Sequence, residues 1–304
     1  GDQRVSFTAL RGVIAPILTP FNDDLSIATD LYIELARRLF DDGCAGLAPF
    51  GTTGEELSVG IDERIEAIDA LINGGVDPAR MIPGTGLSSV ADTARLSRAC
   101  LDRGCAAVMT LPPFYFKGVS EDGIYRYFVE LIDKIGDDAR IFLYHIPPIA
   151  VVGIPPALAA RLHADFPEQV VGIKDSSGDW DNTRRLFDID GLIVYPGSEL
   201  PLIDALDLGG PGCISATANI NMREIVKVVA LYDQGDLEAA RAQQQAISKT
   251  RLAIQEVGPI PAQKRLLAIQ TGDARWANVR PPLDSLSDED GDRLLAELGG
   301  GESK

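Results

Sequence analysis

The feature that most constrains the fold of this chain is a repeated alternation of short apolar runs with longer amphipathic stretches. The runs end in glycine or proline, as strands before a turn do, and the longer stretches have the spacing of helices. Eight runs are predicted to be strands: Val13–Thr19, Gly46–Phe50, Met81–Gly84, Ala106–Leu111, Arg140–Tyr144, Val170–Lys174, Leu192–Tyr195 and Gly212–Ile214. The helices predicted between them include Asp30–Asp41, Asp62–Asn73, Val90–Asp102, Gly123–Ile135, Pro156–His163, Asp181–Phe187 and Leu200–Leu208.

Eight strand–helix units in one chain of 304 residues favour a closed (β/α)8 TIM barrel over an open doubly wound sheet. The barrel is predicted to occupy residues 1–220. After the eighth strand the pattern becomes helical only, roughly from Met222 to Gln270 with a break at Gly258-Pro259, and then from Leu283 to Leu298. Residues 221–304 are therefore predicted to form C-terminal helices packed on the barrel, because no linker separates them as a second domain.

The composition, with 45% hydrophobic and 24% charged residues, is that of a globular protein. No apolar run reaches the roughly 18 residues of a membrane span, and no signal-peptide pattern opens the chain. The four cysteines lie in apolar surroundings without a CxxC pair, so we expect buried, reduced thiols. These features predict a cytoplasmic protein.

The net charge of −17 argues against nucleic acid and anionic membranes as partners, because both attract positive surfaces. A net negative charge is also typical of a surface that keeps a protein in solution, and it carries no information about catalysis. The two histidines, His145 and His163, are too few for the cluster of histidine and carboxylate ligands that a catalytic metal needs. No metal and no cofactor is expected.

One lysine stands out at the end of an apolar run, in the stretch VVGIKDSSGD. Lys174 falls at the carboxyl end of the sixth predicted strand, which is the end of a barrel that carries the active site. A lysine is ordinarily a solvated surface charge, but a barrel strand offers no such surface. Burial lowers the pKa of an amine from about 10.4 to about 7–8 in such sites, which makes it a nucleophile at neutral pH. Lys174 is therefore predicted to form a Schiff base with a ketone, the usual start of carbon–carbon bond making or breaking.

Other loops at the same end of the barrel carry hydroxyl groups. Tyr144 ends the fifth predicted strand in FLYHIPP and is suited to proton transfer. Gly51, Thr52 and Thr53 in PFGTTGEELS offer two hydroxyls and backbone N–H groups that could grip a carboxylate, although the same stretch also suits a plain turn before a helix. Tyr115 in LPPFYFKG is either a further phenol of the site or a rim aromatic at a subunit interface.

Taken together, GVIAPILTPF, GTTGE, LPPFYF, YHIPP, GIKDSSGD and GGPGCISATANI span nearly the whole chain. In these motifs the sequence resembles the dihydrodipicolinate synthase and N-acetylneuraminate lyase family of class I pyruvate-dependent aldolases. The resemblance implies Lys174 as the Schiff-base residue, Tyr144 as acid and base, and Thr52 as proton relay.

The resemblance also implies substrate-binding residues and an assembly. Thr53 would bind the carboxylate of the 2-oxo acid, while Gly197 and Ile214 match positions that line the pyruvate pocket. Tyr115 would complete the relay, and in the family this phenol is often donated by a neighbouring subunit. A homotetramer formed as a dimer of dimers is expected.

The sequence departs from the synthase pattern at Ile149, where synthases carry an arginine that holds the carboxylate of the incoming aldehyde. The stretch ELSVGIDER also lacks the histidines of the lysine-feedback site of some synthases. A Schiff-base lyase or aldolase with a different acceptor, such as a sugar acid, is therefore preferred over a dihydrodipicolinate synthase, which remains the alternative. His145 is predicted to point away from the barrel centre, since neighbours along a strand alternate, and a substrate-facing role in the loop is the alternative.

Within the preferred class, aldol cleavage, dehydration and condensation all use the same amine and differ in the acceptor pocket. A metal-dependent aldolase on a similar barrel would need clustered histidine and carboxylate ligands. A barrel that binds a 2-oxo acid as a sensor is a third possibility, because a fold does not fix a function. Turnover would separate the sensor from the enzyme.

Overall fold

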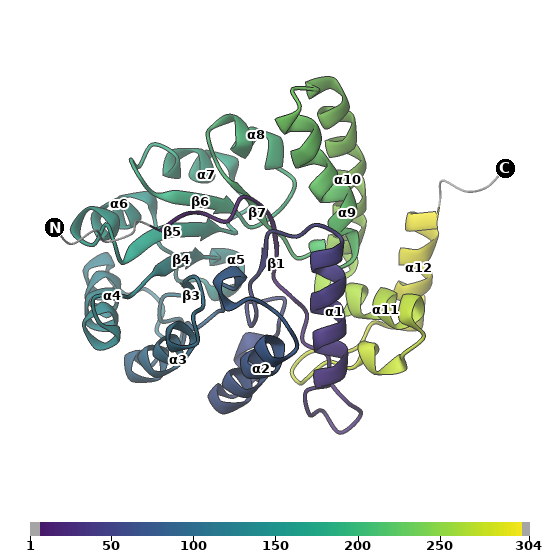
Figure 1. Cartoon of the computed structure of the whole chain (residues 1–304), viewed down its shortest axis with the longest axis horizontal. Coiled ribbons are helices and arrows are strands. Elements are labelled where there is room, and N and C mark those ends of the chain that lie inside the picture. Colours follow the sequence, from purple (N-terminus) through teal and green to yellow (C-terminus); the bar gives the residue numbers. More distant parts are fainter. Residues whose placement is uncertain (1–6, 300–304) are drawn as a thin grey trace. The chain divides into compact units, whose positions relative to one another are not determined.

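The computed structural model describes residues 7–299, which divide into two compact units. One contains residues 7–12 and 77–214, and the other contains residues 13–76 and 215–299. Strands and helices are interspersed as far as Ile214, and the chain is helical beyond it (Figure 1). The division of the chain at residue 220 stays a prediction.

The unit of residues 77–214 is built on a four-stranded parallel sheet in the order β3-β4-β5-β6. The strands of this sheet are β3 (Val108–Thr110), β4 (Ile141–His145), β5 (Val170–Asp175) and β6 (Ile193–Pro196). The unit ends with β7 (Gly212–Ile214), which is not part of this sheet. Its helices are α3 (Val90–Asp102), α4 (Glu121–Ile135), α5 (Pro147–Ala150), α6 (Pro156–Asp165), α7 (Trp180–Leu186) and α8 (Leu202–Asp207), preceded by the 3-10 turn η2 (Pro78–Arg80). Figure 1 shows α3, α4 and α6 following one another around the outside of this sheet.

Register in this sheet places three residues of neighbouring strands side by side. Tyr144 of β4 pairs with Lys174 of β5, and Lys174 pairs with Tyr195 of β6. Parallel strands in register turn paired side chains to the same face. The β5 strand is apolar before Lys174 and buried throughout, as expected of a parallel strand covered on both faces.

The third predicted strand, Met81–Gly84, is reduced to isolated bridges at Met81 and Gly84, and Gly84 bridges to Met109. The N–H of Ala106 donates to the carbonyl of Met81 at 3.0 Å. In a regular parallel ladder the carbonyl of Ala106 would accept from the N–H of residue 83, but Pro83 has no N–H. The side chain of Arg140 donates to the Ala106 carbonyl instead, at 2.8 Å. The prediction of a full strand here is therefore wrong, although the segment lies where a strand would.

The second unit pairs β1 (Gly12–Ala15) with β2 (Gly46–Leu47) in parallel. Its helices are α1 (Thr29–Asp41), α2 (Ile61–Asn73), α9 (Ala218–Asp233), α10 (Leu237–Val257), α11 (Pro259–Thr271) and α12 (Asp288–Gly299), with the 3-10 turns η1 (Glu56–Ser58) and η3 (Ala274–Ala277). The predicted break at Gly258-Pro259 is confirmed, because Gly258 has φ +103° and caps α11. Both strands are shorter than predicted, since Pro16 and the glycine-bounded turn at 51–54 follow them closely.

Three expectations from composition can be compared with the structure. All four cysteines are buried thiols, as predicted. Across residues 7–299 no helix has the length and apolar character to cross a membrane. In the same residues no three His, Cys, Asp or Glu side chains gather to hold a metal ion; that the protein needs none stays a prediction.

Candidate active site

Lys174 and Tyr144 form the centre of the candidate site. They are 4% and 1% exposed, and the lysine Nζ lies 4.6 Å from the centroid of the Tyr144 ring. Both occupy the carboxyl ends of their strands, with the pairing of β4 and β5 fixing their spacing. The sequence-based placement of both residues at strand ends is confirmed.

Aromatic rings line the same face of the sheet one pleat below this pair. Phe142 lies two residues before Tyr144 and packs on Phe7 and Tyr195, with ring centroids 5.6 Å apart in each case. Gly172 pairs with Phe142 in register, and a Cβ there would come within 2.2 Å of its ring. Only glycine leaves room for this ring, so the floor below Lys174 is apolar.

Tyr195, the third residue in register, has a structural role that the sequence did not reveal. Its hydroxyl donates to the backbone carbonyl of Leu10. Burial raises the pKa of Tyr195 well above the ordinary value of a phenol. Tyr195 therefore stays protonated and ties the segment before β1 to β6.

Asp175, which follows Lys174, anchors the end of β5 and was not singled out from the sequence. Its Oδ1 accepts from the N–H of Ser177 at 2.8 Å, and its Oδ2 accepts from Asn182 at 2.9 Å and Thr183 at 2.8 Å. These bonds join the strand end to the first turns of α7. They restrict where the backbone of Lys174 can lie, which positions its side chain.

His145 lies on the face opposite Tyr144, as predicted from alternation. It is buried, and its Nδ1 accepts from the N–H of Ile154 at 2.8 Å. Gly153 lies so close that a Cβ would approach the ring to 2.6 Å. The interpretation of His145 as a packed, hydrogen-bonded residue is therefore supported.

The stability of the protein should fall between about pH 7 and pH 5.5 because of His145. Burial lowers its pKa, although the nearby Asp175 carboxylate opposes that shift. The unfolded chain then takes up a proton at about pH 6.5 that the folded chain does not, so the free energy of unfolding drops as pH falls through this window. Urea unfolding across this range measures the drop. His145→Asn, which can still accept from Ile154 but does not titrate, should flatten the curve; an equal slope in that variant would contradict the assignment.

Gly197 and Ile214 lie at the ends of two further strands of the same unit. The N–H of Gly197, just after β6, donates to the carbonyl of Asp175 at 2.7 Å. A Cβ on Gly197 would lie 1.9 Å from the Oγ of Ser176, so the backbone can approach the end of β5 only with glycine here. Ile214 is the buried last residue of β7.

Tyr115 is not packed against Lys174 and Tyr144. Its side chain is 78% exposed and meets the ring of Phe116 edge to face at 5.6 Å. Ile149, in α5, is 65% exposed, and Val119 and Val151 are exposed as well. Lys117 links the segment of Tyr115 to α5, because its Nζ donates to the carbonyl of Phe114 and, at 3.3 Å, to that of Ala150.

Thr52 and Thr53 belong to the second unit, in a compact turn that the chain itself preforms. The N–H of Glu55 donates to Thr52 at 3.0 Å and that of Glu56 to Gly51 at 3.2 Å. The hydroxyl of Thr19 donates to Gly54 at 2.8 Å. The structure thus brings Tyr144 to Lys174 in one unit and shapes the threonine turn in the other; that the two groups act on one substrate stays a prediction.

Comparison with known proteins identifies the family. The model of the dihydrodipicolinate synthetase family matches residues 9–299. An "Uncharacterized DapA-like lyase" of Chloroflexus aurantiacus is 36% identical over 92% of this chain and 93% of its own. The 4-hydroxy-tetrahydrodipicolinate synthase of Thermus thermophilus is 32% identical over 93% and 94%.

A solved structure agrees with these sequences. The dihydrodipicolinate synthase of Agrobacterium tumefaciens is 35% identical, covers 95% of this chain and 98% of its own, and superposes with a TM-score of 0.87. The fold class is the predicted (β/α)8 TIM barrel with C-terminal helices. The chain therefore belongs to the dihydrodipicolinate synthetase family and is an enzyme of its class I lyase and aldolase type.

Proposed function

We propose that the protein forms a Schiff base between Lys174 and a 2-oxo acid, with pyruvate as donor or product. It then makes or breaks a carbon–carbon bond to an aldehyde other than aspartate semialdehyde. The observation that carries this proposal is the buried Lys174 amine, 4.6 Å from the ring centroid of Tyr144 and above an apolar floor. Burial disfavours the ammonium form, and the neutral amine is the nucleophile.

The proposed reaction begins with attack of the Lys174 nitrogen on the C2 carbonyl of pyruvate. The carbonyl oxygen takes up a proton and then leaves as water after a second protonation, so a C=N bond replaces C=O. Tyr144 supplies and recovers these protons, with Thr52 and Tyr115 passing them on. The protonated imine draws electrons from C3, which loses a proton to give an enamine.

The enamine carbon then attacks the aldehyde carbon, and the new alkoxide takes up a proton. Water adds to the imine carbon, the C–N bond breaks, and the amine of Lys174 is restored. Cleavage of a 2-keto-3-deoxy sugar acid follows the same steps in reverse and releases pyruvate. No oxidant or reductant is needed in either direction.

Other parts of the chain fit supporting roles. The preformed turn at Gly51–Thr53 offers hydroxyl and N–H donors to the pyruvate carboxylate, and Gly197 and Ile214 line the pocket. The exposed ring of Tyr115 is suited to enter the site of a second copy, within a homotetramer built from dimers. The four buried thiols suit a cytoplasmic enzyme.

Ile149 is the reason for proposing a different acceptor. A carboxylate on the aldehyde needs a charged or multiply hydrogen-bonded partner, and a bidentate arginine is the usual one. At this position the chain presents an exposed hydrocarbon side chain instead. An aldehyde with hydroxyl groups, such as glyceraldehyde, carries no carboxylate to be neutralised.

The runner-up is 4-hydroxy-tetrahydrodipicolinate synthase, since relatives with that name are 32% identical over most of the chain. Lys117 is a cation whose Nζ donates to the carbonyl of Ala150, the residue after Ile149, and it could take the place of the arginine. His145 is less suited, because Ile154 holds its Nδ1 on the other face of the sheet.

Assays with pyruvate and a panel of aldehydes, followed by product mass, test the acceptor. We expect weak turnover with aspartate semialdehyde, and Ile149→Arg should raise kcat/KM for it about 30- to 1000-fold, the range for one charge-assisted bidentate contact. Ile149→Lys and Ile149→Gln are controls for charge and size. Wild-type kcat/KM near ~10⁴–10⁵ M⁻¹s⁻¹ with no gain from arginine would favour the synthase instead.

A further inference from the structure

The turn that carries Thr52 and Thr53 is bounded by two residues in an unfavourable backbone conformation. Phe50 has φ +57° and Glu55 has φ +58°, both in the left-handed region that residues other than glycine seldom adopt. A strained backbone of this kind persists only where the surroundings hold it. Something other than the local sequence must therefore fix the turn.

At Glu55 a buried ion pair holds the backbone in this conformation. The side chain of Glu55 and that of Lys264 in α11 are both 0% exposed, and the Nζ of Lys264 lies 2.6 Å from the Oε2 of Glu55. The Oε1 of Glu55 accepts from the N–H of Arg280 at 2.9 Å. Both carboxylate oxygens are thus bonded to the C-terminal part of the chain.

Lys264 is itself held in place from several sides. Its Nζ donates to the carbonyl of Asn278 at 2.7 Å and lies 4.5 Å from the ring centroid of Phe21. Burial lowers the pKa of Lys264 to about 8, with the Glu55 carboxylate opposing this shift and the Arg280 charge adding to it. Its donors point at Glu55 and Asn278, so this amine is a structural cation.

The guanidinium of Arg280 fastens the segment just beyond the turn. It donates to the carboxylate of Glu63 at 2.6 and 2.9 Å and to the carbonyl of Ser58 at 2.9 Å. It also donates to the carbonyl of Leu25 at 2.8 Å. Arg280, which follows α11, therefore bonds to Glu55 through its backbone and to Ser58 and Glu63 through its side chain.

A buried ion pair such as Glu55–Lys264 need not add to the free energy of unfolding. A buried ion pair can often be replaced by apolar side chains at no cost in stability, because both charges lose their hydration. Glu55 also belongs to the turn through its backbone, since its N–H donates to the carbonyl of Thr52. The backbone of Glu55 thus closes the turn that carries Thr52 and Thr53.

We infer that the Glu55–Lys264 pair is a positioning device that holds the Thr52–Thr53 turn in the geometry that binds the carboxylate of the 2-oxo acid. The inference rests on the proposed function for the identity of the ligand. On this inference Lys264 of α11 and Glu55 at the end of the turn are added to the residues that determine the affinity for pyruvate. Neither touches the substrate.

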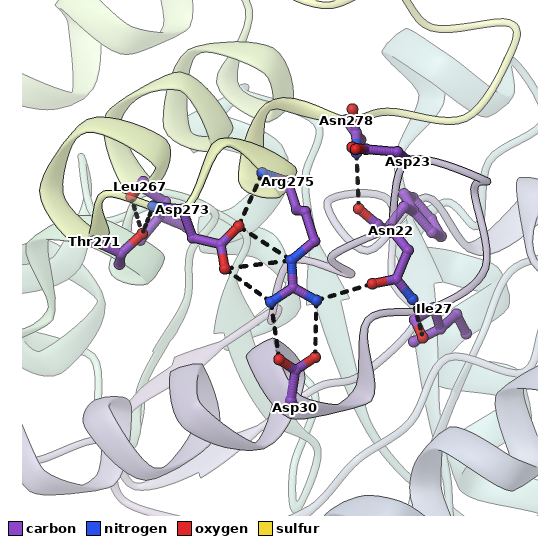
Figure 2. Close-up of polar contacts among 10 residues, drawn as sticks. Asn22, Asp23, Ile27, Asp30, Leu267, Thr271, Asp273, Arg275 and Asn278 are labelled. Carbon is purple, nitrogen blue, oxygen red and sulfur yellow. Dashed lines mark hydrogen bonds and ion pairs between the residues drawn. The ribbon is translucent and has the colours of Figure 1, made fainter.

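Arg275 provides a matched control, because it fastens the same C-terminal segment elsewhere. Figure 2 shows its guanidinium between Asp273, Asp30 and Asn22, with contacts to Asp30 at 2.9 and 3.2 Å. None of these partners belongs to the turn at residues 50–55. Arg275→Met therefore loosens the segment without releasing Glu55.

The experiment compares Lys264→Met with Arg275→Met after their free energies of unfolding have been measured. Borohydride trapping of the imine at increasing pyruvate gives the half-saturating concentration. We expect it to rise about tenfold or more in Lys264→Met and less than about twofold in Arg275→Met, with similar trapping at saturation. In a Thr53→Val background Lys264→Met should add little, because both act on one contact.

Hydrogen exchange at the turn gives a second readout that does not depend on pyruvate. The amides of Glu55 and Glu56 should exchange about tenfold faster in Lys264→Met and stay as in the wild type in Arg275→Met. If wild-type protein traps no pyruvate, the proposed function fails, while the exchange result still decides whether the pair holds the turn.

The double variant Glu55→Gln/Lys264→Met leaves no unpaired buried charge, so it keeps the test available where the single variant does not fold. It should show the same loss of pyruvate affinity and of amide protection. Wild-type affinity together with wild-type exchange in a folded Lys264 variant overturns the inference.

Discussion

Replacing Lys174 with arginine is expected to abolish both turnover and the capture of pyruvate by borohydride. A guanidinium stays protonated at neutral pH and has no lone pair to attack a ketone, although the positive charge is kept. Loss of a covalent nucleophile removes most of the catalysis, on the order of 10⁴-fold or more. Mass spectrometry of the reduced adduct should place it on the peptide that contains Lys174 in the wild type.

Lys264 is the critical comparison for this prediction, since it is the other lysine buried among residues 7–299. Its pKa is lowered to about 8, so a reactive amine could be suspected there from titration alone. Its Nζ is directed at Glu55 and Asn278 at 2.6 and 2.7 Å, which leaves no approach for a ketone. An adduct on the Lys264 peptide, or capture that survives Lys174→Arg, would contradict the mechanism.

The sequence was sufficient to predict the strand–helix order and the position of Lys174. Both depend on local patterns: an apolar run of the length of a strand, ended by a polar residue and a turn. The orientation of His145 followed from alternation alone. The strand predicted at Met81–Gly84 failed because apolar content says nothing about the missing N–H of Pro83.

Other features depend on contacts between distant residues and could not be predicted from local patterns. Lys264 is on a helix, as predicted, but a helical lysine is ordinarily a solvated charge, and its partner Glu55 is 209 positions away in the sequence. The short helix α5 is not predictable from the sequence because the four residues PPIA are too short to show a helical period. The side chain of Tyr115 is 78% exposed, and no spacing in the sequence carries that information.

Tyr144→Phe is expected to slow turnover by roughly 10²–10⁴-fold, the span for lost acid and base help, while the fold is kept. The ring remains to pack beside Lys174, and only the hydroxyl that we propose to move protons is removed. Imine formation should slow together with turnover, because the leaving hydroxyl of the carbinolamine then lacks its proton donor. Thr52→Val should cost less, since water can replace a relay more readily than the acid itself.

Tyr195→Phe is the matched control, because Tyr195 also pairs with Lys174 in register and is equally buried. Its hydroxyl bonds to Leu10, so its loss should lower the free energy of unfolding by about 1 kcal/mol and leave kcat within a few-fold. Single-turnover trapping with pyruvate and urea unfolding measure the two effects. Equal rates for Tyr144→Phe and the wild type, or an equal loss of rate in both tyrosine variants, would show that proton transfer does not depend on the phenol of Tyr144.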